Sequence, residues 1–205
     1  MWSADPLDRP DQLPDQGDAS PDTTYCAVGR SLSTWGLLED QFAILFAVFL
    51  DVGGVGMTAA VRSFGSIITS NSRSEVLSSA AEAYFAVHKD PVLQAAFKSL
   101  MQRYRKATSR RNEIAHGVVL GLARAGYSSI FYYDSGRPTL PSGFRDEGYY
   151  LFPSTYATRK RTVDHQPDYW FSSSDIARYT EQFLLMREEA SAFQTSLSEA
   201  QSRTR

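Results

Sequence analysis

The stretch from Pro91 to Val118, PVLQAAFKSLMQRYRKATSRRNEIAHGV, decides the expected fold. At about 100° per residue, its apolar side chains share one stripe of a long helix. Arg111 falls near the middle of that stripe, although arginines are rarely buried unless they are paired. An arginine at this position indicates either an ion pair or a functional site. The stripe consists of Leu93, Phe97, Leu100, Tyr104, Ala107, Ala115 and Val118.

Composition limits the functions that the chain can have. Its 205 residues are 42% hydrophobic, which is enough for one domain with a core. The net charge of −2 excludes a general attraction to nucleic acid, so any such contact needs a local basic patch. The single cysteine and the three histidines are too far apart for a zinc site. We therefore expect no metal and no cofactor.

The N-terminal residues have neither the basic nor the apolar segment of a signal peptide. The most apolar run, residues 42–50, is far shorter than the roughly 20 residues that cross a membrane. These features favour a soluble cytoplasmic protein that does not enter a membrane.

Composition also divides the chain into segments. Residues 1–29 are rich in Asp and Pro and predict an irregular arm. Residues 30–198 form the expected single domain, and 199–205 a polar tail. Apolar spacing predicts helices from Ser31 or Ser33 to about 50, from 58 to about 70, from Ser72 or Ser74 to about 88, and from 91 to about 118. A closing helix follows at 175–197.

Residues 119–172 differ from the preceding residues in composition, with many aromatic and β-branched side chains. The segments SSIFYYD and GYYLFP predict two strands joined by a turn, and DYWFS a third. The aromatic side chains would either stack on bases or fill one face of a small sheet, and the second is the more common. The expected fold is mainly α, an antiparallel helical bundle with a small antiparallel β insertion before the C-terminal helix.

The residues from Arg111 to His116, RNEIAH, with Gly117 after them, resemble the Arg-x4-6-His signature of the HEPN superfamily (higher eukaryotes and prokaryotes nucleotide-binding domains). Trp35-Gly-x-Leu-Glu39 is similar to the opening of bacterial members. The resemblance implies a helical bundle that dimerises, so that two motifs face one cleft. It also implies metal-independent ribonuclease activity, with RNA and an antitoxin or other protein as partners. The β insertion departs from the minimal family bundle.

The resemblance implies roles for individual residues. His116 would be the general acid or base at the RNA 2′-hydroxyl, and Arg111 would stabilise the phosphate charge. Asn112 would orient the site, and Glu39 is a weaker candidate for a polar partner of Arg111. Because RNA carries its own nucleophile, such a site needs no metal. The alternative function is a non-catalytic HEPN-like scaffold that binds a protein or nucleotide.

A purely structural interpretation of the same residues stays open. Arg111 could be a buried ion-pair partner of Glu39 or Glu82. His116 could stabilise the C-terminal end of the helix, with Gly117 as the terminating residue.

A cluster of basic side chains precedes the motif. Arg103, Lys106 and Arg110 lie within about 60° on one helix face and could follow an RNA backbone. A solvated helix face is an equally good interpretation of these charges.

Overall fold

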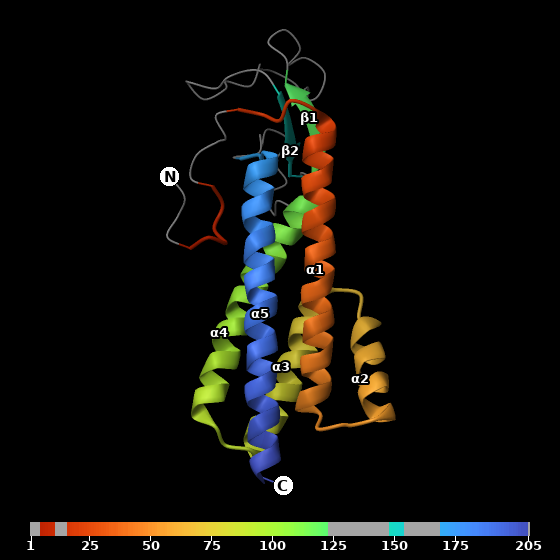
Figure 1. Cartoon of the computed structure of the whole chain (residues 1–205), viewed down its shortest axis with the longest axis vertical. Helices are drawn as coiled ribbons and strands as arrows, with labels where there is room; N and C mark the ends of the chain where they lie inside the picture. The colour runs from red at the N-terminus through yellow and green to blue at the C-terminus, as the bar shows by residue number, and fades with distance from the viewer. Residues whose placement is uncertain (1–4, 11–15, 123–147, 154–168, 205) are drawn as a thin grey trace, which may run out of the picture. The chain divides into compact units, whose positions relative to one another are not determined.

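The computed structural model describes residues 5–10, 16–122, 148–153 and 169–204. Within them the chain is mainly helical, with one small two-stranded antiparallel sheet (Figure 1). This confirms the predicted fold class at that level. The elements are α1 (Pro21–Phe49), α2 (Val55–Gly65), α3 (Ser70–Val87), α4 (Pro91–Ala115), β1 (Val118–Leu122), β2 (Gly148–Phe152) and α5 (Ser173–Thr204).

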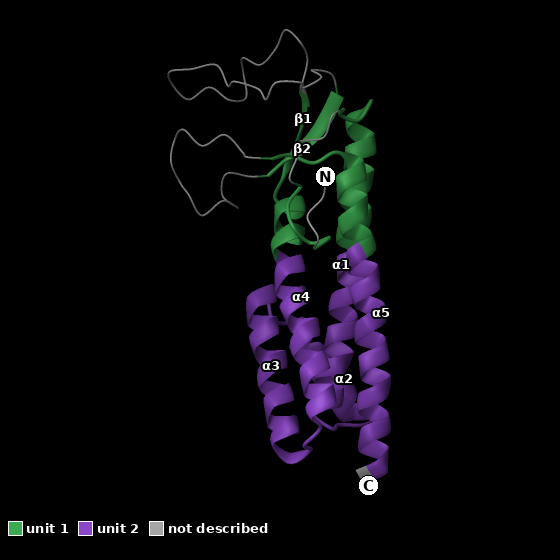
Figure 2. Ribbon diagram, turned by 90° about the vertical axis from the view of Figure 1, so that its left-hand side faces the viewer, with its two compact units in different colours: residues 1–33, 109–181 green, residues 34–108, 182–205 purple. Residues whose placement is uncertain are grey.

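The chain divides into two compact units, coloured separately in Figure 2. Unit 1 comprises residues 1–33 and 109–181, and unit 2 comprises residues 34–108 and 182–205. The sequence had predicted a different division, into an arm, a single domain and a tail. Helices α1, α4 and α5 each contribute residues to both units.

Helix α1 begins at Pro21, well before the predicted start at Ser31 or Ser33. The local signals explain the earlier start, because proline suits the first helical position and an acidic residue, Asp22, suits the first turn. Ser20 precedes them, and its Oγ accepts a hydrogen bond from the backbone N–H of Thr23 at 3.4 Å. The predicted irregular arm therefore ends before residue 21.

Two further helix starts have clear chemical causes. Asp90 precedes α4, and its carboxylate accepts hydrogen bonds from the backbone N–H groups of Val92 and Leu93, at 3.0 and 2.9 Å. At α5, Ser172 Oγ accepts from the N–H of Asp175, while Asp175 accepts from the N–H of Ser172. This reciprocal pair is a capping box at Ser172, whereas the sequence Ser174-Asp175 predicts the cap two residues later.

The core of unit 2 follows the predicted spacing. The predicted inward positions of α1 are almost fully buried, namely Trp35, Leu38, Phe42, Leu45 and Phe49. The same holds for Phe183, Met186, Ala190 and Phe193 of α5. Trp35 stacks on Tyr104 at 5.3 Å between ring centroids and meets Phe183 edge-on at 5.0 Å. Aromatic contacts of this kind join α1, α4 and α5 in unit 2.

Some predicted core positions are wrong. The apolar pattern of the third helix predicts that Val76 and Val87 face inward, and that of the second helix places Ile68 on its apolar side, but all three are exposed. The buried side of α3 instead runs through Leu77, Ala81 and Tyr84, and Val87 is the last residue of the helix. Ile68 lies after the end of α2, in the connection to α3.

The sheet of unit 1 differs in part from the predicted one. Strand β2 confirms the GYYLFP segment, but its partner in the sheet is β1, which the sequence had assigned partly to the end of a helix. The opposite edge of β2 bonds to two isolated residues, Asp18 with Tyr149 and Phe171 with Leu151. Phe171 belongs to the predicted third strand, DYWFS. The described part of this segment forms only the single bridge of Phe171 with Leu151. The SSIFYYD segment lies outside the described residues.

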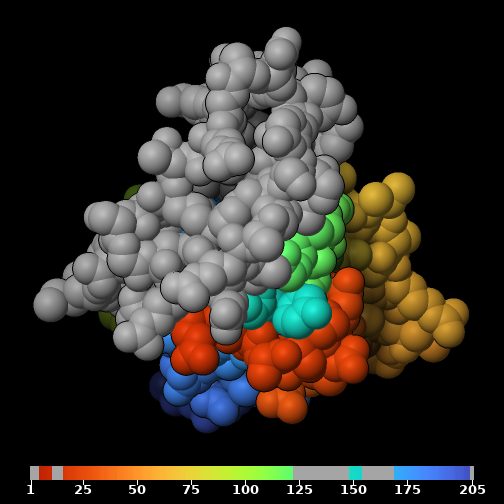
Figure 3. Space-filling view, turned by 90° about the horizontal axis from the view of Figure 1, so that it is seen from above, coloured from red at the N-terminus to blue at the C-terminus, as the bar shows by residue number. Residues whose placement is uncertain are grey.

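Two glycines allow the N-terminal residues to approach β2. Gly148 has a φ of +135°, and a Cβ built on it would lie 2.6 Å from the Cα of Gly17. A Cβ on Gly17 would lie 2.8 Å from the Gly148 backbone. Figure 3 shows the red residues that precede α1 directly against cyan β2. Neither position accommodates a side chain without movement of the backbone.

Helix α1 is long and apolar enough to cross a membrane by length and composition alone. Half of its most apolar window is buried inside the structure. Because its apolar positions pack against other helices of unit 2, it has the character of a core helix.

Candidate functional site

The three predicted catalytic residues lie at the C-terminal end of α4, from Arg111 to His116 directly after the helix, and all belong to unit 1. Arg111 is half-buried, and its Nη1 donates a hydrogen bond to Oδ1 of the adjacent Asn112 at 2.9 Å. His116 follows the last helical residue, and its side chain is exposed. Its backbone N–H donates to the carbonyl of Asn112 at 3.1 Å, which extends the helical bonding to the motif's end.

The buried positions of this turn are not the predicted ones. Arg110 and Glu113 are 9% and 4% exposed, whereas Arg111 is only half-buried. From Tyr104 and Ala107 the buried stripe steps by three residues to Arg110, and it therefore passes one residue before Arg111. The arginine on the apolar face of α4 is Arg110.

Glu113 pairs with two arginines, one through each of its carboxylate oxygens. Its Oε2 lies 2.7 Å from Nη1 of Arg110, and its Oε1 accepts a hydrogen bond from Nη2 of Arg9 at 3.0 Å. The Arg9 guanidinium also sits over the Tyr169 ring, 4.5 Å from its centroid. Burial alone would lower the pKa of Arg9, but the hydrogen bond and charge of Glu113 outweigh it and raise that pKa.

Two tyrosines complete this group of side chains. Burial, and then the interaction of the hydroxyl with Glu113 by hydrogen bonding and by charge, raise the pKa of Tyr169 well above its usual value. Burial also raises the pKa of Tyr179, with the positive charge of Arg110 opposing the shift. We call Arg9, Arg110, Glu113, Tyr169 and Tyr179 the arginine–tyrosine cluster. Four of its members are buried, and Arg9, whose side chain is 46% exposed, covers Glu113 from the surface.

The sequence did not indicate that Arg9, Glu113, Tyr169 and Tyr179 are partners of one another, and it placed the fifth member, Arg110, on the surface. The pairing of Arg110 with Glu113 had a signal, because an Arg and a Glu three residues apart on one helix face can form an ion pair. Arg9 had none, since it is 104 residues from Glu113 in the chain.

Glu39 lies in unit 2 and has partners there. Its Oε2 is 2.5 Å from Nη1 of Arg73, and its Oε1 accepts hydrogen bonds from Ser70 at 3.2 Å and Tyr104 at 3.5 Å. Arg73 also donates to the carbonyls of Ile67 and Gly65. Glu39 thus helps to hold the connection between α2 and α3. Glu82, the other predicted carboxylate, is exposed on α3.

The predicted basic patch does not exist as one surface, because Arg110 is buried. Arg103 pairs with Glu189 of α5 and is half-exposed, as is Lys106. The neighbouring Arg105 donates to Ser74 and Ser78 of α3. The sequence also offers Arg159, Lys160 and Arg161 as a basic loop that could contact RNA, but these three lie outside the described residues.

Most of the aromatic side chains considered for base stacking are buried where the structure describes them. Tyr150, Tyr169 and Trp170 are each at most 7% exposed, while Tyr149 is half-buried. Trp170 contacts Tyr150 and Phe152 of β2, at 6.2 and 5.4 Å between ring centroids, and Tyr169 contacts Phe171 at 5.2 Å. This supports the sheet-filling interpretation. Tyr132, Tyr133 and Tyr156 lie outside the described residues.

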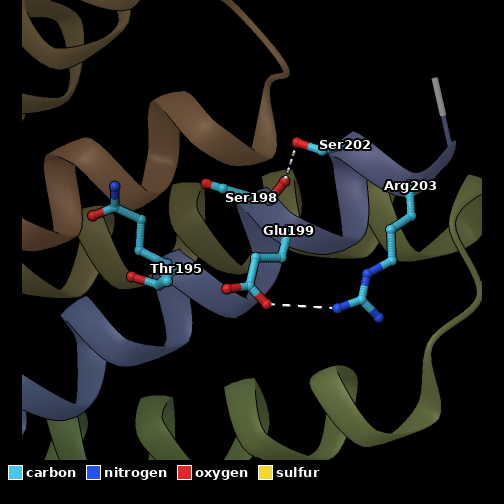
Figure 4. Close-up of a pocket in the computed structure, with 6 residues that line it drawn as sticks. Thr195, Ser198, Glu199, Ser202 and Arg203 are labelled. Atoms are coloured by element: carbon cyan, nitrogen blue, oxygen red, sulfur yellow. Dashed lines mark hydrogen bonds and ion pairs between the residues drawn. The ribbon is translucent and has the colours of Figure 1, made fainter.

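A shallow surface pocket lies on α5 in unit 2 (Figure 4). Its six lining residues all come from this one helix, and its one ion pair, Arg203 with Glu199 at 3.6 Å, is largely exposed. The pocket therefore lacks the converging groups of an active site. Within residues 5–10, 16–122, 148–153 and 169–204, no three His, Cys, Asp or Glu side chains gather as metal ligands would.

Comparison with known proteins adds no identification, because no family model, curated protein or solved structure matches this chain. The candidate site is therefore judged from the chemistry of its side chains alone. Among the described residues, it consists of Arg111, Asn112 and His116 at the end of α4.

Proposed function

We propose that the protein binds RNA and cleaves it without a metal ion, in the manner of HEPN ribonucleases, at the end of α4. The observation that carries this proposal is the exposed His116 at the end of the helix that holds Arg111 and Asn112. In a homodimer of the HEPN type, two such helix ends would face one cleft, and RNA would bind across it.

The chemistry requires few groups. His116 would take the proton from the 2′-hydroxyl or give one to the leaving 5′-oxygen, since imidazole can do both near neutral pH. Arg111 would stabilise the charge on the phosphate, which a guanidinium matches with paired donors. The hydrogen bond from Arg111 to Asn112 would limit the orientations of that guanidinium before RNA binds.

Burial within α4 favours a functional over a structural role for Arg111. The structural interpretation required a buried arginine with a carboxylate partner, and Arg110 with Glu113 fulfils it. The neighbouring Arg111 is half-buried, and its Nη1 donates a hydrogen bond to the side-chain amide of Asn112. An arginine and an exposed histidine at the same helix end suit an anionic substrate such as the RNA phosphate.

The test uses substrate chemistry. Single-stranded RNA of mixed sequence is incubated with the full-length protein in EDTA, beside the same sequence with 2′-O-methyl groups. The proposal predicts that only the unmodified RNA is cut, leaving 2′,3′-cyclic phosphate ends, because the 2′-hydroxyl is the nucleophile. Equal cutting of the methylated strand would contradict the proposed mechanism, and no cutting of either would remove the ribonuclease activity for that RNA.

A further inference from the structure

The residues before α1 attach closely to the turn that carries the candidate site. The segment Asp5–Pro10, here called the strap, begins with a turn in which Asp5 accepts hydrogen bonds from the N–H groups of Leu7, at 2.9 Å, and Asp8, at 3.0 Å. That turn directs Leu7 into the interior, where it is 1% exposed. A buried leucine at this point anchors the strap by the hydrophobic effect.

Polar contacts hold the strap at two further points, both in unit 1. The hydroxyl of Tyr179 donates to the carbonyl of Asp8 at 2.8 Å, which ties the strap to α5. Arg9 donates to Glu113 of α4 and lies over the Tyr169 ring. An apolar anchor, a hydrogen bond, an ion pair and a cation–π contact thus act within three consecutive residues.

The contact with Glu113 links the strap to the candidate site. Glu113 lies two residues after Arg111 and three before His116, on the buried side of the same turn. Its carboxylate is fixed by one arginine from its own helix and one from the strap. Helix ends fray unless side chains or packing hold them, and this turn is the last of α4.

We propose that the strap is a positioning element for the site, with Arg9 holding Glu113 so that the last turn of α4 keeps Arg111 and His116 in a fixed arrangement. The positioning claim rests on the proposed ribonuclease function, but the attachment of the strap does not. Loss of Arg9 would leave Glu113 with one partner and would allow residues 112–116 to open more often.

Hydrogen exchange of the full-length protein tests the attachment without RNA. In Arg9→Ala and in Leu7→Ala, we expect faster exchange across residues 5–10, and roughly fivefold to tenfold faster exchange across residues 112–116. Arg9→Lys keeps the charge and should restore part of the protection. Arg30→Ala, an exposed arginine of α1 in the same unit, is the control and should change neither segment.

Cleavage kinetics test the positioning role. Arg9→Ala should lower kcat by a factor of about ten while KM changes less than twofold, since the geometry of the reacting groups changes and RNA contacts do not. Partial rescue by Arg9→Lys should accompany this loss. The strap proposal would be overturned if residues 112–116 exchanged in Arg9→Ala and in Leu7→Ala at the same rate as in the parent protein. An unchanged kcat in Arg9→Ala would overturn it as well. If the parent cuts no RNA, the exchange measurement still decides whether the strap holds the turn.

Discussion

Arg110 and Glu113 face each other one helical turn apart on α4, with 2.7 Å between charged atoms and side chains that are 10% and 6% exposed. Burial of two charges costs several kcal/mol each in desolvation, which their attraction and their other contacts must offset. Here the second partner of Glu113, Arg9, contributes to that balance. The pair therefore makes this turn sensitive to the loss of any one member.

Removal of the shared carboxylate should be costly. We expect Glu113→Ala to lower the free energy of unfolding by about 3–5 kcal/mol, because Arg110 would remain buried without a counter-charge. Urea denaturation followed by circular dichroism measures the change. The control is Glu199→Ala, which breaks an ion pair whose side chains are 78% and 62% exposed and should cost less than about 1 kcal/mol. Similar losses in the two variants would contradict the special role of Glu113.

Glycine substitutions should have opposite effects at two positions. Gly148→Ala places a methyl group 2.6 Å from the Cα of Gly17 at a φ of +135°, so we expect a loss of about 1–3 kcal/mol. Gly29→Ala lies in the exposed interior of α1, with no atom within 4 Å of the new Cβ, and should stabilise by about 0.5–1 kcal/mol. Thermal unfolding measures the change in stability of each variant. A change of the same sign in both variants would contradict the close approach of Gly17 to Gly148.

Because of the two tyrosines of the arginine–tyrosine cluster, we expect the free energy of unfolding to fall at alkaline pH. Their pKa values are raised above the ordinary 10.0, so the unfolded chain loses their protons first as the pH rises. Their contribution to the free energy of unfolding is fully present below about pH 10. Above that pH it should fall, by at most about 1.4 kcal/mol per pH unit for each tyrosine.

Denaturation at pH 9 to 11 measures this slope. Tyr169→Phe should make it shallower, because one titrating group is gone, whereas Tyr25→Phe controls for loss of a hydroxyl at an exposed position. An identical slope in the parent and in Tyr169→Phe would show that burial of Tyr169 does not control the alkaline loss.

Local patterns predicted much of the fold. The apolar spacing in α1 and α5 identified their buried faces because 3.6-residue periodicity acts within one helix. The boundaries were less accurate, since strong local signals such as Ser20-Pro21 lay within a segment whose overall composition predicted an irregular arm. Composition averages over many residues, whereas a cap depends on two or three.

The candidate site was predictable only in part. The motif could be found because Arg111, Asn112 and His116 are close in sequence. The one-residue error arose because the buried positions run from Tyr104 through Ala107 and Arg110 to Glu113 at a constant spacing of three. Each such step turns the buried side by about 60°, whereas the prediction assumed one straight stripe. The contact of Arg9 with Glu113 joins residues far apart in the chain, and nothing local encodes it.

The central claim is that Arg111 and His116 cleave RNA, and the most direct measurement is the cleavage rate in EDTA of the parent and two histidine variants. His116 and His88 each follow the last residue of a helix, but His88 lies in unit 2 and stacks on Tyr84. We predict that His116→Ala slows cleavage by a factor of about 10² or more, while His88→Ala cuts at the parent's rate. Cleavage that survives unchanged in folded His116→Ala, or none by the folded parent, would contradict the account.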